Sequence, residues 1–188
     1  MSILREITQE KHQAVENLPF IQYLLHGGIT QEHYVIYLAE MLEIYCHLES
    51  HATNLGLISD MPELPRAERM RQDLEELAPG FQPSITDATK KYLAYLNDLA
   101  HSERPNQLFA HIYVRHLGDM YGGKLIAKRV PGTGRWYEFE NRGDLVRRFN
   151  NHLSLDLADE ALIAFDHFYN IFHDLWARIH NSACDSTS

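Results

Sequence analysis

One segment of the chain has the pattern of a long helix that is interrupted by glycine. Residues 106–129, NQLFAHIYVRHLGDMYGGKLIAKR, carry apolar residues at helical spacing, yet Gly118, Gly122 and Gly123 fall within six positions. Each glycine costs a helix about 1 kcal/mol relative to alanine. Gly118 and Gly122 share a helix face, so a flat body could lie there against the main chain, with Asp119 at its rim. Close packing of two helices, or a simple kink, is the alternative that the glycines alone leave open.

The rest of the chain has the periodicity of an all-α protein. We expect helices over residues 3–15, 19–25, 30–54, 66–77, 84–101, 106–129, 143–153 and 158–179. Ser84 with Asp87 has the spacing of an N-terminal capping box for the fifth of these. No segment alternates as a strand does, and 188 residues suffice for one well-cored domain. The sequence therefore predicts a single-domain helical bundle over residues 1–180, followed by a polar tail over 181–188.

The charge of the chain is unevenly distributed. The net charge of −9 disfavours general binding to nucleic acid. Residues 115–148 nevertheless contain eight basic and four acidic residues, so this segment carries +4 and the remainder −13. A local basic surface on an acidic protein suits a small anionic ligand or an acidic protein partner. For any single basic residue, a solvated helix face is the alternative.

Three features bear on location. No apolar run reaches the length of a membrane-spanning helix, and the N-terminal MSILREITQEKH lacks the apolar core of a secretory signal. Cys46 and Cys184 provide no disulfide framework. We therefore expect a cytoplasmic protein that does not enter the membrane.

A histidine near the N-terminus has neighbours that suit a heme ligand. His12 lies on a predicted amphipathic helix, and Glu16, one turn later, can accept a hydrogen bond from the far ring nitrogen and fix the tautomer. Arg5, two turns earlier on the same face, can meet an anionic group. With a glycine-bearing helix to cover the other side, these residues indicate a clamp for heme, in which His12 is the metal ligand.

Other histidines give a weaker signal for a metal. His47 and His51 are four apart, with Glu43 and Glu49 nearby, which is the composition of a carboxylate–histidine site. A di-iron site of the ferritin type needs Glu-x-x-His on two helices, and the sequence does not repeat that pair.

Three segments resemble the heme oxygenases that form biliverdin. LREITQEKHQAVEN at residues 4–17 resembles the proximal helix of that family, AHIYVRHLGDMYGG at 110–123 resembles its distal-helix signature, and residues 28–49 follow the family pattern. The resemblance implies an all-α fold in which heme b is held between a proximal and a kinked distal helix, with His12 as the axial ligand. It implies that heme, as both substrate and prosthetic group, is cleaved with O2 to biliverdin, ferrous iron and carbon monoxide. Electrons would come from an acidic donor such as ferredoxin or from a flavin reductase, and the relatives would be soluble bacterial, algal or phage-type enzymes.

The resemblance also assigns roles to individual residues. Asp119 would hold a water that delivers a proton at the oxygen-binding face, with Tyr45 and Arg115 in the same network. Because Arg115 is four residues before Asp119, a simple ion pair on the helix surface is the alternative for it. The remaining expected contacts with heme are the glycines, which let the helix approach, and candidates for the propionates: Gly118, Gly122, Gly123, Tyr113, Arg147 and Arg148.

The sequence departs from the family pattern in the heme-contacting regions. Gln9 stands where the family often has a lysine, and Tyr121 replaces a small serine, so its ring would either crowd the pocket or stack outward. An asparagine expected in the distal network has no clear counterpart, although Phe168 and Asn170 are near its position. These departures bear on the position of ring opening more than on activity.

Two other functions compete with the enzyme. A heme carrier or sensor would keep His12 but would need neither Asp119 nor the glycines. A related fold with di-iron or thiamin chemistry is disfavoured by the intact heme motif and by the missing carboxylate–histidine pairs.

Overall fold

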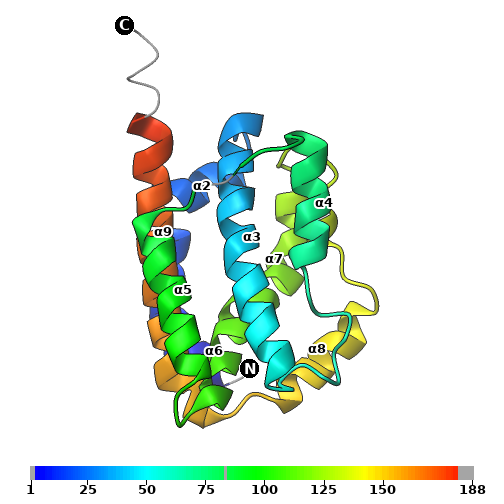
Figure 1. The fold of residues 1–188 in the computed structure, drawn as a ribbon, viewed down its shortest axis with the longest axis vertical. Coiled ribbons are helices and arrows are strands. Elements are labelled where there is room, and N and C mark those ends of the chain that lie inside the picture. Colours follow the sequence, from blue (N-terminus) through cyan, green and yellow to red (C-terminus); the bar gives the residue numbers. More distant parts are fainter. Residues whose placement is uncertain (1–2, 83, 182–188) are drawn as a thin grey trace, which may run out of the picture.

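The computed structural model describes residues 3–82 and 84–181, and all of its regular structure in these ranges is helical. The α-helices, drawn in Figure 1, are α1 (Ile3–Glu16), α2 (Pro19–His26), α3 (Gln31–Asn54), α4 (Ala67–Leu77), α5 (Asp87–Ala100), α6 (Leu108–Ile112), α7 (Gly118–Ala127), α8 (Arg142–Asn151) and α9 (Ala158–Asn181). Shorter turns link them: η1 (Pro105–Gln107), η2 (Tyr113–Leu117), η3 (Arg135–Tyr137) and η4 (Leu155–Leu157). The predicted all-α fold is confirmed.

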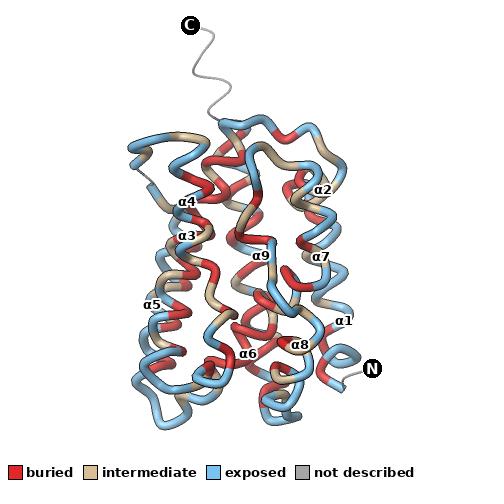
Figure 2. Tube along the Cα trace, turned by 90° about the vertical axis from the view of Figure 1, so that its right-hand side faces the viewer, coloured by how far each residue is buried: buried red, intermediate tan, exposed pale blue. Residues whose placement is uncertain are grey.

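The long helix α3 runs through the middle of the bundle, with α5 and α9 on one side of it and α4 on the other (Figure 1). Helix α9 also packs against α1, α2 and α6. In Figure 2, α1, α2 and α7 lie on the side of the molecule opposite α3, α4 and α5, and the buried positions of each helix face inward. The proximal and distal helices expected from the sequence thus belong to one side of the bundle.

Capping explains where two of the helices begin. The Thr30 hydroxyl accepts the His33 N–H at 3.2 Å and starts α3, as the sequence predicts. The predicted Ser84 cap of α5 is wrong, because Thr86 caps that helix and accepts the Thr89 N–H at 3.2 Å. Buried Glu40 accepts both the N–H and the hydroxyl of Thr86, and these two bonds from α3 set the start of α5.

The segment predicted as one interrupted helix, 106–129, is divided at a different place from the glycines. A π-helical turn, Tyr113–Leu117, separates α6 from α7, whereas the glycines lie inside regular α-helix that ends at Ala127. A π-turn inserts an extra residue into the helical repeat and is frequent at functional sites. It rotates the residues that follow it relative to those before it.

Two further features complete the fold. Within residues 3–82 and 84–181, no helix combines the length and the apolar content that crossing a bilayer requires. Helix α9 continues through Asn181, and residues 182–188 of the predicted tail lie outside the described part of the chain. The predicted boundary between domain and tail stays a prediction.

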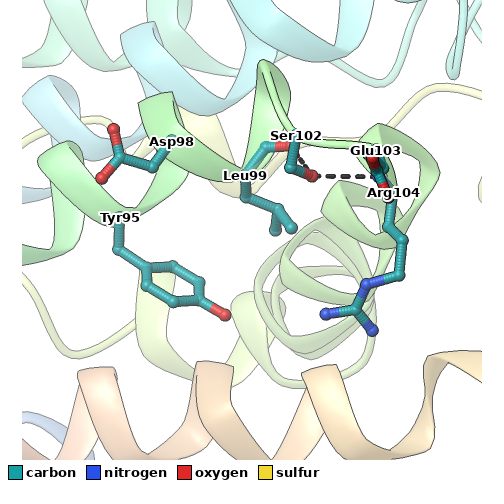
Figure 3. Close-up of a pocket in the computed structure, with 6 residues that line it drawn as sticks. All are labelled: Tyr95, Asp98, Leu99, Ser102, Glu103 and Arg104. Carbon is teal, nitrogen blue, oxygen red and sulfur yellow. Dashed lines mark hydrogen bonds between the residues drawn. The ribbon is translucent and has the colours of Figure 1, made fainter.

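A surface hollow of about 400 Å³ lies at the C-terminal end of α5 (Figure 3). Its lining residues are Tyr95, Asp98, Leu99, Ser102, Glu103 and Arg104. All of them come from one short stretch of the chain, and none is a residue that the sequence predicts to contact heme.

Candidate functional site

The structure brings together three polar side chains that the sequence assigns to one network. Tyr45 projects from α3, Arg115 from the π-turn and Asp119 from the first turn of α7. The Tyr45 hydroxyl donates to Asp119 Oδ2, and Arg115 Nε donates to the Tyr45 oxygen at 3.2 Å. Arg115 Nη2 is 3.6 Å from Asp119 Oδ1. We call these three residues the distal cluster.

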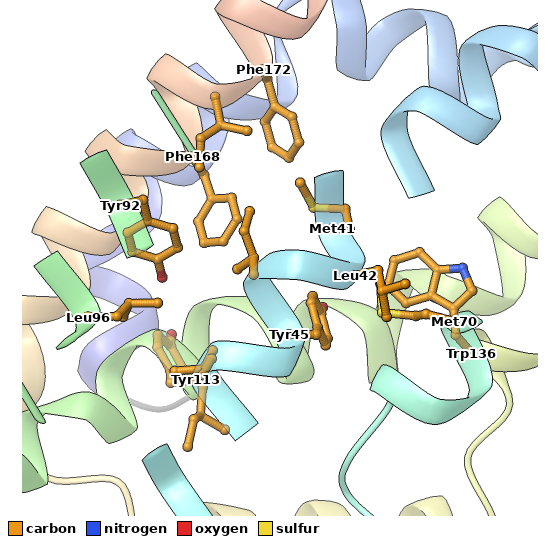
Figure 4. Close-up of a cluster of buried hydrophobic side chains, with 14 of the residues drawn as sticks. Met41, Leu42, Tyr45, Met70, Tyr92, Leu96, Tyr113, Trp136, Phe168 and Phe172 are labelled. Carbon is orange, nitrogen blue, oxygen red and sulfur yellow. The ribbon is translucent and has the colours of Figure 1, made fainter. Parts of the chain in front are cut away.

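The distal cluster is buried among aromatic rings. Tyr45 is fully buried and Asp119 is 5% exposed. The Arg115 guanidinium lies 4.7 Å from the ring centroid of Phe168, which Figure 4 shows in the same buried group as Tyr45. A simple surface ion pair is therefore not the arrangement of Arg115, because its side chain is enclosed and shared between Tyr45 and Asp119.

Burial raises the proton affinity of the Asp119 carboxyl. Loss of water raises the pKa of its carboxyl, while the Arg115 charge and the hydrogen bond from Tyr45 oppose that rise. Burial also raises the pKa of Tyr45 well above its ordinary value, so the phenol stays protonated and acts as the donor. A carboxyl whose pKa is raised binds a proton more readily than an ordinary aspartate, and general acid–base catalysis uses such a group.

Two of the three glycines of α7 have open space beside them. A methyl group added at Gly118 or at Gly122 would meet no atom within 4 Å. Gly123 differs, because an added methyl would lie 2.7 Å from Cδ1 of Tyr137. Gly118 and Gly122 therefore leave a bare strip of helix, whereas Gly123 serves the packing of α7 against η3.

Helix α1 presents His12 with the predicted acidic partner. His12 Nδ1 is 3.5 Å from Glu16 Oε2, and the edge of its ring meets Phe165 with centroids 5.8 Å apart. The His12 side chain is 52% exposed, and its Nε2 has no bonding partner in the described residues. Arg5 is also exposed on α1. This donor set fits heme: one ring nitrogen faces a carboxylate while the other remains available to iron.

The candidate propionate partners are one buried tyrosine on the distal helix and two arginines of α8 that form ion pairs. Tyr113 is the first residue of the π-turn and is buried in the aromatic group of Figure 4. Arg147 forms an ion pair with Asp144 on α8. Arg148 bonds to Asp144 and to Glu63, so both guanidinium groups are already engaged by carboxylates.

The departures from the family pattern have clear positions. The Tyr121 side chain points outward, since the residue is 62% exposed and its ring lies 6.0 Å from the Arg142 guanidinium carbon. Phe168 occupies the place beside Arg115, while Asn170 and Gln9 are exposed. The distal cluster thus has an aromatic ring beside Arg115, and the counterpart of the expected asparagine stays open between Phe168 and Asn170.

Sequence reasoning missed a buried pair next to the distal cluster. His116 Nε2 lies 2.9 Å from Glu49 Oε1, and the His116 ring is 4.9 Å from that of Tyr45. Glu49 lies four residues after Tyr45 on the same face of α3. The sequence did contain one signal for this pair, because Glu49 is a charged residue at a position where the helical spacing predicts a buried side chain.

Comparison with known proteins agrees with this geometry. The sequence pattern that defines the heme oxygenases matches residues 1–174 of the chain. The chain belongs to the heme oxygenase family. Heme oxygenase 1 of Bos taurus is 33% identical over 97% of this chain and 73% of its own length. Heme oxygenase 2 of Macaca fascicularis is 29% identical over 92% of this chain, which spans only 64% of that relative.

A solved structure of a heme oxygenase shares the fold. The crystal structure of heme oxygenase-2 from Synechocystis sp. PCC 6803 in complex with heme and NO has a TM-score of 0.80 and 27% identity. The similarity covers 95% of this chain and 86% of that one. The likeness therefore extends through α8 and α9, where the sequence motifs are weakest.

Proposed function

We propose that this chain is a working heme oxygenase that holds heme between α1 and the Gly118–Gly122 strip of α7. His12 would hold the heme iron in this proposal. The bound heme supplies the O2-activating iron and is itself the substrate, and it is cleaved to biliverdin, ferrous iron and carbon monoxide.

The observation that carries this proposal is the position of the distal cluster beside the bare strip. Asp119 follows Gly118 directly in the chain, so its proton-holding carboxyl lies at the edge of the surface that lacks side chains. A heme carrier gains nothing from a buried carboxyl held by a tyrosine and an arginine. Proton delivery in a water-poor site uses such a group directly.

Each residue then has a defined task. Glu16 fixes the ring of His12 and increases its basicity as a ligand. Tyr45 and Arg115 hold the Asp119 carboxyl in one orientation. Phe168 closes one side of Arg115 and limits the entry of bulk water to the distal cluster.

An acidic electron donor, such as ferredoxin or a flavin reductase, would bind to a basic surface at the C-terminal end of α7. Lys124, Lys128 and Arg129 are exposed there and form no ion pair with the described residues. Arg135, by contrast, is neutralised by Asp73 and Glu76. The identity of the donor and the cytoplasmic location stay predictions.

The test of the proposal is substitution of the proton-holding carboxyl. Asp119→Asn keeps the shape of the side chain and can still accept from Tyr45, but it cannot release and regain a proton at neutral pH. We expect Asp119→Asn to bind heme while biliverdin formation falls by about 10²- to 10⁴-fold. Glu160→Gln, at an equally buried carboxylate outside the distal cluster, should retain turnover. Biliverdin formation at the wild-type rate by Asp119→Asn would contradict the role of Asp119.

A further inference from the structure

His116 is a buried histidine that touches the distal cluster but has no task in the proposed reaction. It is the fourth residue of the π-turn and is 1% exposed. His116 makes two contacts with α3: its Nε2 atom bonds to Glu49, and its ring packs against the ring of Tyr45.

Glu49 is a rigid anchor for this histidine. Its carboxylate accepts the N–H of Arg66, the N-cap of α4, at 2.6 Å and the N–H of Ala67, its first residue, at 3.0 Å. A carboxylate between two backbone donors has little freedom to turn. Because a carboxylate only accepts, His116 Nε2 must carry the hydrogen of the bond between them, and this fixes the orientation of the imidazole.

The other side of His116 reaches the distal cluster through Tyr45. The ring centroids of His116 and Tyr45 are 4.9 Å apart, and Trp136 meets the Tyr45 ring edge-on at 5.7 Å. The Tyr45 ring thus contacts two other rings while its hydroxyl donates to Asp119. The connection runs without a break from the start of α4, through Glu49, His116 and Tyr45, to Asp119.

The same arrangement places charges around Asp119. Burial raises the pKa of the Asp119 carboxyl, whereas the charge of Arg115 and the hydrogen bond from Tyr45 lower it. The ionisable groups grouped around His116 are contributed by α3, by the start of α4 and by the distal helix: Glu49, Tyr45, Arg66, Arg115 and Asp119. Loss of the imidazole should therefore change both the geometry and the protonation of the distal cluster.

We propose that His116 is a positioning residue: braced by Glu49, it holds the Tyr45 ring so that the Tyr45 hydroxyl stays on Asp119. The proposal rests on the proposed function for the purpose of that hydrogen bond. The bracing itself is a property of the protein without heme, so it is measured there.

The experiment compares three variants of the full chain. His116→Phe keeps a ring beside Tyr45 but loses the bond to Glu49, and His116→Gln restores a donor that can reach Glu49. His111→Phe is the matched control, because His111 is also a buried histidine of the same segment, with Nε2 3.0 Å from Glu160 Oε1.

Two readouts report on the distal cluster. In the heme-free protein, tyrosine labelled with ¹³C at Cζ gives a signal for Tyr45, which is assigned with Tyr45→Phe. In the ferric heme complex, a pH titration followed by the visible spectrum gives the midpoint, the pH at which the spectral change that reports on the distal face is half complete. We expect His116→Phe to move the Tyr45 signal and to raise that midpoint by about half a unit or more. We expect His116→Gln and His111→Phe to stay near the wild-type values.

The outcomes separate this proposal from the proposed function. An unchanged Tyr45 signal in heme-free His116→Phe overturns it, and so does an equal change in His111→Phe, which would make the effect one of general packing. If His116→Phe does not fold, Glu49→Leu, which leaves no acceptor for His116 Nε2, must move the Tyr45 signal in the same direction, and a wild-type signal there overturns the proposal. A wild-type protein that makes no biliverdin refutes the proposed function, while the heme-free signal still decides the role of His116.

Discussion

Two adjacent glycines of α7 should respond in opposite ways to the same substitution. At Gly122 an added methyl meets no atom within 4 Å, so Gly122→Ala keeps only the gain in helix propensity. We expect the free energy of unfolding of the heme-free protein to rise by about 0.5–1 kcal/mol. The same methyl occupies the strip where heme is proposed to lie, and heme affinity should fall by about tenfold, or roughly 1.4 kcal/mol.

At Gly123 the methyl has no room. It would lie 2.7 Å from Cδ1 and 3.2 Å from Cβ of Tyr137, whose ring is buried and packs on Trp136 with centroids 4.0 Å apart. Overpacking of this kind costs about 1–3 kcal/mol, which exceeds the gain in propensity of about 1 kcal/mol. Gly123→Ala should therefore lose up to about 2 kcal/mol of stability.

Urea denaturation of the heme-free variants, followed by circular dichroism, measures the first effect, and titration with hemin at the Soret band measures the second. A loss of stability in Gly122→Ala would show that this glycine serves the fold. Wild-type heme affinity in Gly122→Ala would contradict the proposed heme surface. Wild-type stability in Gly123→Ala would refute the packing argument.

Three further predictions concern other parts of the chain. His12→Ala should abolish the normal axial ligation, and an unchanged Soret and ligand-field spectrum would place the iron ligand elsewhere. Burial lowers the pKa of His167 to about 4, so the unfolded chain binds a proton that the folded chain does not, and stability is lost as the pH falls from about 6.5 to about 4. Urea titrations at pH 7 and pH 4.5 measure how much the free energy of unfolding falls between the two pH values. After allowance for the partial exposure of His167, this fall should be about 1–2 kcal/mol smaller in His167→Gln than in the wild type. An equal fall in both proteins would show that His167 is not its origin. Thr86→Ala should lower the melting temperature through a loss of about 1–2 kcal/mol, whereas Ser84→Ala should have little effect; the reverse order would restore Ser84 as the cap.

The sequence predicted the helices and the main partners at the site because these depend on local spacing. The pair His12 and Glu16 is one helical turn apart, and so is the pair Arg115 and Asp119. The meeting of Tyr45 with Asp119 spans 74 positions and came only from the resemblance to heme oxygenases. Spacing along the chain gives no means of deriving such a contact.

The details that the sequence did not predict are tertiary effects. The π-turn separates α6 from α7 without any proline or glycine inside it, so no local breaker marks its position. The different roles of Gly122 and Gly123 depend on Tyr137, which arrives from another part of the chain. Thr86 rather than Ser84 caps α5 because Glu40 of α3 binds it.

The most direct test of the account is an aerobic spectrum of the purified protein with one equivalent of hemin, followed by reductant in the presence of catalase. Catalase removes free peroxide, which degrades heme without control by a protein. A working heme oxygenase should give a sharp Soret band that decays into the broad red absorption of a bilin, with carbon monoxide released. A Soret band that persists with ferredoxin and with flavin reductase as donors would contradict turnover and favour a heme carrier.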